Sequence, residues 1–118
     1  MKLRFHGDTL RLRLSQSEVA SLGESGRVEE TVTFQAGQEL RYTLDSGEVT
    51  EPAAIFEGGE IRVTLPAEQV KHWIESDQTG IESSAGILRI LVEKDFQCLH
   101  SASELEADAF PNPMSDKF

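Results

Sequence analysis

The stretch Phe56-Glu-Gly-Gly-Glu-Ile-Arg-Val-Thr-Leu65 has a counterpart near the start of the chain, where residues 5–14 read Phe-His-Gly-Asp-Thr-Leu-Arg-Leu-Arg-Leu. A shift of 51 positions, which carries Phe5 onto Phe56, aligns a glycine, an arginine and three apolar residues of the two stretches. Further aligned pairs are Val19 and Val70, Leu22 and Trp73, and, at a shift of 48 positions, Leu40-Arg41 and Leu88-Arg89. The sequence therefore predicts an internal duplication, here called repeat 1 and repeat 2.

Repeat 1 shows an order of elements that reads strand–strand–helix–strand–strand. Gly7-Asp8 separates two runs of alternating apolar and polar residues, which is typical of a hairpin. Ser15 and Glu18 have the spacing of a capping box, in which each side chain accepts a hydrogen bond from a backbone N–H at the start of a helix. The predicted elements are strands 2–6 and 9–14, a helix that ends near Gly23 or Gly26, and strands 27–34 and 39–45.

Repeat 2 has the same order of predicted elements. Pro66 starts a helix whose buried stripe contains Val70, Trp73 and Ile74, with Trp73 as its main anchor. Residues 87–92 are apolar on both faces, which is typical of a central strand. The predicted elements are strands 54–57 and 60–65, the helix from Pro66, and strands 79–83 and 87–92.

The predicted fold class is α+β, with about eight mostly antiparallel strands and two helices in a curved or barrel-like sheet. Two repeats of one unit are expected to pack about a pseudo-twofold axis. We expect one domain over residues 1–100, with repeat 1 over about 1–46 and repeat 2 over about 54–96. Residues 101–118 are expected to form an acidic, proline-containing tail.

Composition excludes some classes of protein. The 118 residues include 11 Lys and Arg against 21 Asp and Glu, a net charge of −10, which argues against nucleic acid or an anionic membrane as the main partner. The one cysteine, Cys98, allows no disulfide within the chain. The start of the chain has polar residues too early for a signal peptide, and no apolar run approaches the roughly 18 residues of a spanning helix. We expect a cytoplasmic protein that does not bind membranes.

Four arginines occupy matched positions of the two repeats: Arg11 and Arg62, and Arg41 and Arg89. If they converged on one concave face, they would suit a phosphate or polycarboxylate ligand, as in an anion-binding or phosphohydrolase-like domain. The order of elements resembles that of barrel enzymes acting on triphosphates, although residues 2–6 do not carry their Glu-x-Glu-x-Lys metal motif. The alternative is that the arginines pair across strands with Glu29, Glu30, Glu39, Glu60 or Glu82 on a solvated face.

Cys98 and His100 form a second candidate site directly after the last strand. With Glu93 or Asp95 they could supply metal ligands, and His6 and His72 are available elsewhere in the chain. Cys98 could also act as a nucleophile if Lys94 or His100 lowered its pKa. The Cys-x-His spacing is not that of a structural zinc site, and an inert cysteine is the alternative.

The run Glu93-Lys94-Asp95-Phe96-Gln97-Cys98-Leu99, followed by Asp108-Ala109-Phe110-Pro111-Asn112-Pro113, resembles a family of small uncharacterised bacterial proteins. Lys2-Leu3-Arg4, Leu10-Arg11-Leu12 and Gln16-Ser17-Glu18-Val19 are also similar to that family, so the resemblance spans nearly the whole chain. It implies a bacterial origin and carries no established function, cofactor or site residue.

The sequence does not identify an activity. We expect a non-enzymatic binding or assembly protein that forms a homo-oligomer or captures a protein partner. The expected interaction residues are Trp73 and Phe110, the latter as the anchor of a segment that docks in a groove of its own domain, of a second subunit or of a partner. Solvated disorder of the acidic tail is the alternative.

Overall fold

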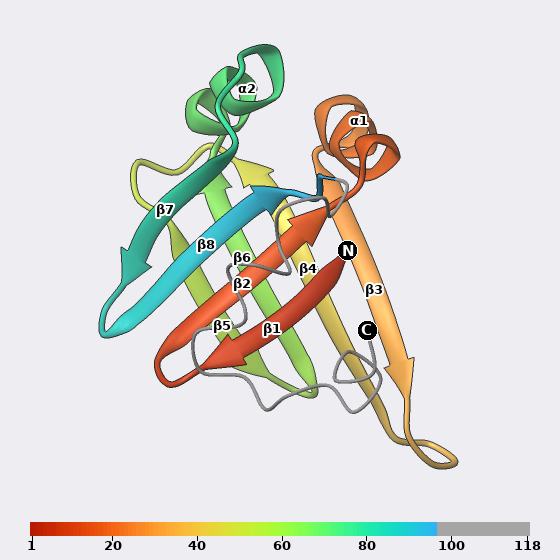
Figure 1. Ribbon diagram of the computed structural model, residues 1–118. Helices are drawn as coiled ribbons and strands as arrows, with labels where there is room; N and C mark the ends of the chain where they lie inside the picture. The colour runs from red at the N-terminus through yellow and green to blue at the C-terminus, as the bar shows by residue number, and fades with distance from the viewer. Residues whose placement is uncertain (97–118) are drawn as a thin grey trace, which may run out of the picture.

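The computed structural model describes residues 1–96, which form two four-stranded sheets with two helices at one end (Figure 1). Repeat 1 consists of β1 (Lys2–His6), β2 (Thr9–Leu14), α1 (Gln16–Ser25), β3 (Arg27–Thr33) and β4 (Glu39–Gly47). Repeat 2 consists of β5 (Ala53–Glu57), β6 (Glu60–Pro66), α2 (Ala67–Glu75), β7 (Gly80–Ala85) and β8 (Leu88–Lys94). The α+β class and the repeated strand–strand–helix–strand–strand order are confirmed.

Each sheet contains one hairpin from each repeat. Sheet A has the strand order β1-β2-β8-β7, and sheet B has the order β3-β4-β6-β5. Strands within a hairpin are antiparallel, whereas the central pairs β2–β8 and β4–β6 are parallel. The exchange of hairpins follows from the helices, because α1 leads from sheet A to sheet B and α2 leads back again. The two repeats are thus interlocked and share one core.

The barrel-like closure considered from the sequence is not formed. The strand pairs of residues 1–96 all lie within one sheet or the other, so β1, β7, β3 and β5 remain edge strands. The physical reason is that the chain passes between the sheets through helices, so that side-chain packing joins the sheets where a barrel would use backbone hydrogen bonds.

The core lies between the sheets. Alternating residues of the central strands point into it: Leu10, Leu12, Leu14, Leu44, Ile61, Val63, Leu65, Ile90 and Val92 are all buried. The predicted central position of the last strand is confirmed, since β8 lies between β2 and β7. The strand begins one residue later than predicted, because Ile87 lies in the turn after Gly86, whose φ is +65°, and is 88% exposed.

The helices close one end of this core. The predicted capping box is present at the start of α1, and Gly26 ends that helix in the left-handed conformation. Leu22 and Trp73, which the duplication aligns, are buried on the inner faces of α1 and α2. Trp73 has no exposed surface, so it anchors its helix as predicted, but its side chain offers nothing for a partner to contact.

Candidate functional site

The four matched arginines do not converge on one face. They alternate with buried residues along their strands, so they point away from the core. Arg11 and Arg89 lie on the outer face of sheet A, whereas Arg41 and Arg62 lie on the outer face of sheet B. The structure therefore separates them into two pairs, with both sheets between the pairs.

Each matched arginine lies close to a carboxylate, and the pairings are duplicated too. Arg62 Nε lies 3.7 Å from Asp45 in sheet B, and Arg11 Nε lies 3.2 Å from Glu93 in sheet A. Asp45 and Glu93 are themselves related by the shift of 48 positions that relates Arg41 to Arg89. Edge-strand glutamates complete the pattern, with Glu29 beside Arg41 and Glu82 beside Arg89. The ion pairs thus belong to the framework that both repeats share.

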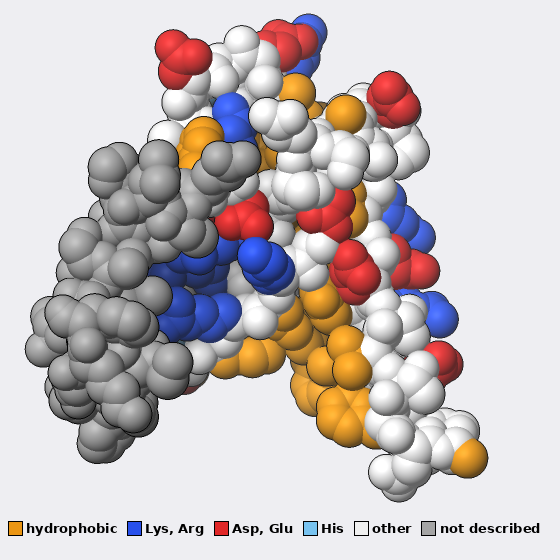
Figure 2. All heavy atoms as spheres, turned by 45° about the vertical axis from the view of Figure 1, so that its right-hand side comes forward, with side chains coloured by type: hydrophobic (Ala, Val, Ile, Leu, Met, Phe, Trp, Pro, Cys, Tyr) orange, Lys and Arg blue, Asp and Glu red, His pale blue; other side chains and the backbone are white. Residues whose placement is uncertain are grey.

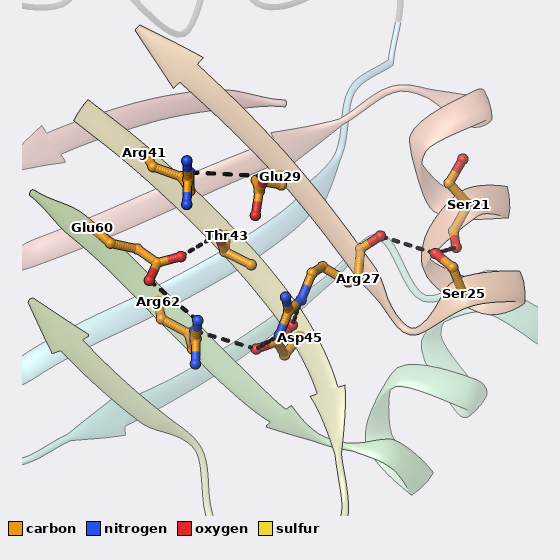
Figure 3. A network of polar contacts seen from close by, with 9 residues as sticks. All are labelled: Ser21, Ser25, Arg27, Glu29, Arg41, Thr43, Asp45, Glu60 and Arg62. Carbon is orange, nitrogen blue, oxygen red and sulfur yellow. Dashed lines mark hydrogen bonds and ion pairs between the residues drawn. The ribbon is translucent and has the colours of Figure 1, made fainter. Parts of the chain in front are cut away.

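Figure 3 shows this framework on sheet B. Asp45 accepts a hydrogen bond from Arg27 at 2.6 Å and also faces Arg62, while Glu60 accepts one from the Thr43 hydroxyl at 3.0 Å. The hydrogen bond from Thr43 lowers the pKa of Glu60, and the nearby Arg62 lowers it further. The hydrogen bond to Asp45 raises the pKa of Arg27. The network therefore favours the charged forms of Glu60 and Arg27, while Arg62 Nε, 3.7 Å from Asp45, is buried without a hydrogen-bond partner within residues 1–96.

The outer face of sheet A differs from that of sheet B in charge. Its outward positions carry five cations and two carboxylates: Lys2, Arg4, Arg11, Arg13 and Arg89, with Glu82 and Glu93. We call this surface the basic face, and Figure 2 shows it as a group of blue side chains. A pocket of about 450 Å³ lies on it, lined by residues that include Arg4, His6, Thr9, Arg11, Arg89 and Leu91.

A second concave surface lies between the sheets at the end away from the helices, where Figure 2 shows orange side chains in a notch. This groove has a volume of about 460 Å³, and its lining is hydrophobic throughout. Three pairs of residues that the duplication aligns line it: Phe5 and Phe56, Leu10 and Ile61, and Leu40 and Leu88. Both repeats thus contribute to the groove, with Ala54 and Ile55 of repeat 2 completing its lining. Phe5 is 54% exposed and Phe56 is 72% exposed.

The model of a family of unknown function, DUF7009, matches residues 1–114. The chain belongs to this family. No curated protein and no solved structure matches the chain. Within residues 1–96 of this family member, no helix is long and apolar enough to cross a membrane.

The predicted metal site of the DUF7009 chain, Cys98 and His100, lies outside the described residues, as does Phe110. Among residues 1–96, no three His, Cys, Asp or Glu side chains are grouped as metal ligands. His6 lines the pocket on the basic face, and His72 lies on α2.

Sequence reasoning named His6 only as an available metal ligand, did not single out Arg4 as a site residue, and missed the groove. Phe5 and Phe56 were recognised as matched residues, and each occupies an inward strand position that would normally be buried. The alternation of inward and outward residues along β1 and β5 therefore already pointed to two apolar side chains on the inner side of the sheets. This pattern could be interpreted as a groove only from the structure, in which the ends of β1 and β5 extend past the packed core and leave Phe5 and Phe56 exposed.

Proposed function

We propose that the protein is a non-enzymatic binding or assembly protein that receives an extended, aromatic-containing protein segment in the groove between its sheets. The observation that carries this proposal is the pair of matched phenylalanines, Phe5 and Phe56, held more than half exposed at the mouth of an apolar groove. Exposing these side chains to water is unfavourable, and a contiguous apolar concavity typically marks an interaction site.

The lining determines the chemistry of the occupant. No charged side chain lines the groove, so a charged ligand would lose its hydration without gaining a partner. The volume of about 460 Å³ lies within the range of small binding pockets, about 300–1,000 Å³. Aromatic side chains that enter such pockets dominate the affinity of protein interfaces. An aromatic anchor on an extended segment fits these conditions.

The chain itself contains such a segment, Asp108-Ala109-Phe110-Pro111-Asn112-Pro113. We assign this segment as the occupant because of its reach. β8 begins beside the groove with Leu88 and ends with Lys94 near the helices, a span of about 20 Å at about 3.3 Å per residue. The 16 residues from Lys94 to Phe110 cover up to about 50 Å when extended, so the segment can enter its own groove or that of a second copy.

A labelled peptide tests the proposal. The peptide carries residues 104–116 and is titrated into full-length Phe110→Ala protein, which lacks the competing anchor, while fluorescence anisotropy is followed. We expect saturable binding that Phe5→Ser and Phe56→Ser each weaken about tenfold or more. Phe34→Ser is the matched control, because Phe34 is 69% exposed but does not line the groove.

Two results would count against the groove. One is equal binding by a peptide in which Phe110 is replaced by alanine, and the other is an equal loss of affinity in Phe34→Ser. Light scattering measures the mass of the wild type and of Phe110→Ala, and so shows whether the segment comes from the same copy of the chain or from a second copy. A mass that falls to that of a monomer in Phe110→Ala means that a second copy supplies the segment, and a monomer in both cases means that the same copy does.

A further inference from the structure

We infer that the basic face of sheet A binds a small oxyanion, such as a polyphosphate or a polycarboxylate, with Arg4, Arg11 and Arg89 as its principal donors. The duplication provides an internal comparison for this inference. Features that both repeats keep belong to the shared framework, and features of one repeat alone need another explanation.

Three of the five cations of the basic face, Lys2, Arg4 and Arg13, are of the second kind, whereas Arg11 and Arg89 have arginine equivalents in sheet B. Register places four side chains of β1 and β2 at positions whose equivalents in β5 and β6 carry no positive charge. These equivalents are Ala53 for Lys2, Ile55 for Arg4, Glu57 for His6 and Thr64 for Arg13. The outward positions of sheet B carry three cations, Arg27, Arg41 and Arg62, against five carboxylates, Glu29, Glu39, Asp45, Glu57 and Glu60. The framework ion pairs therefore do not require the extra cations of sheet A.

The register also places like charges opposite each other. Arg4 is the cross-strand partner of Arg11. Lys2 is the cross-strand partner of Arg13, but Lys2 pairs with Asp95 and Arg13 with Glu93, which offsets the repulsion there. Like charges at directly opposite positions destabilise a strand pair. The equivalent of the first pair in sheet B is Ile55 opposite Arg62, which carries no such repulsion. An anion bound between Arg4 and Arg11 would convert this repulsion into two attractive contacts.

The donors of this pair are also incompletely used. Arg4 forms no ion pair with any residue in 1–96. Arg11 Nε is buried and lies 3.2 Å from Glu93 without a hydrogen bond within the described part of the chain. Its equivalent Arg62 Nε is buried in the same state 3.7 Å from Asp45, so this feature belongs to the shared framework. The salt-bridge distances overstate these contacts, because a hydrogen bond also requires alignment of the N–H. The feature specific to sheet A is therefore Arg4, for which a ligand oxygen in the pocket would be an acceptor.

The lining of the pocket defines the class of ligand. Guanidinium groups bind phosphate and carboxylate oxygens in a bidentate manner, and three of them surround the pocket. His6 and the Thr9 hydroxyl can donate further hydrogen bonds. Glu82 and Glu93 also line the pocket, where Glu82 pairs with Arg89 and Glu93 lies beside Arg11. A small oxyanion with two or more negative charges fits these groups, and we assign a free small molecule as its source.

Thermal unfolding of the full-length protein tests the site, with inorganic tripolyphosphate and citrate as probes at constant ionic strength. We expect at least one probe to raise Tm in a concentration-dependent, saturating manner. Arg4→Gln and Arg11→Gln should each weaken the apparent affinity about tenfold or more, as loss of a charge-assisted hydrogen bond predicts. Arg62→Gln should keep the response, because Arg62 is the equivalent of Arg11 on sheet B. Arg4→Gln should also raise Tm without a probe at low salt, because it removes a like-charge pair.

The chain's own carboxylates, Glu104, Glu106 and Asp108, are the competing source of negative charge. A full-length variant with all three replaced by amides distinguishes the sources. A response confined to this variant supports the anion site but overturns the assignment to a free small molecule, because the acidic segment then competes for the site. No response in either protein overturns the inference, and so does an equal loss of response in Arg62→Gln and Arg11→Gln.

Discussion

Replacement of Trp73 by alanine tests the shared core, because the indole is fully buried at the point where α2 packs on the sheets. A buried tryptophan removes about 200 Å² from water, which corresponds to about 5 kcal/mol at about 25 cal/mol per Å². Trp73 Nε1 is a buried donor with no hydrogen-bond partner within residues 1–96. Such a donor destabilises the folded state by about 1–3 kcal/mol, and the alanine variant no longer carries this penalty. We therefore expect Trp73→Ala to lower the free energy of unfolding by about 2–4 kcal/mol, at the lower end of the usual range for such changes.

Urea unfolding followed by circular dichroism measures this loss, and thermal unfolding should show a Tm lower by about 4–8 °C for each kcal/mol. Leu22→Ala at the equivalent position of α1 should also destabilise the protein, by about 2–5 kcal/mol. Ile87→Ala is the control, because Ile87 is 88% exposed and its loss should change stability by less than about 0.5 kcal/mol. A midpoint for Trp73→Ala equal to that of wild type would refute the shared core.

Four further predictions concern the backbone, the N-terminus and the tail. Gly23→Ala should stabilise α1 by about 0.5–1 kcal/mol, because a Cβ there meets only Ile74 at 3.5 Å. Gly80→Ala should destabilise the protein, because the added Cβ would lie 3.0 Å from the Val92 carbonyl oxygen. Unfolding midpoints of the two variants equal to that of the wild type would contradict both expectations. Burial opposes charge on the Met1 ammonium and on Glu18, but their mutual hydrogen bond raises the pKa of the ammonium above 8.0 and lowers that of Glu18 below 4.5. The stability that this pair contributes should be fully present between pH 4.5 and pH 8.0. It should decline as pH falls through the folded-state pKa of Glu18 and as pH rises through that of the Met1 ammonium. A Glu18→Gln variant whose stability depends on pH in the same way as the wild type would contradict this. Removal of residues 101–118 should leave a folded domain, and loss of a dispersed NMR spectrum would show otherwise.

Local signals predicted the elements well. The capping box of Ser15 and Glu18 and the matched hairpins depend on residues that are close in sequence, so their interactions can be inferred from spacing. The exchange of hairpins could not be inferred in this way. The pairing of Leu12 with Val92 joins residues 80 positions apart, and packing of the shared core decides it.

The candidate sites depended on the same long-range information. The duplication identified Arg11 and Arg62 as equivalents, but only the assignment of their hairpins to different sheets showed that they face apart. Arg4 became a candidate only when the register placed it opposite Arg11. Both results are consequences of which strands pair, and a single sequence gives little information on pairing across such distances.

A two-dimensional ¹⁵N–¹H NMR titration tests the central proposal most directly, because it locates the occupant of the groove. Full-length Phe110→Ala protein is titrated with the unlabelled peptide of residues 104–116. The proposal predicts that the largest shift changes fall on amides at the mouth of the groove, around Phe5, Phe56 and Leu88. Changes confined to sheet A, where the basic face lies, with none around Leu40, Phe56 and Ile61 of sheet B, or no changes at all, would contradict it.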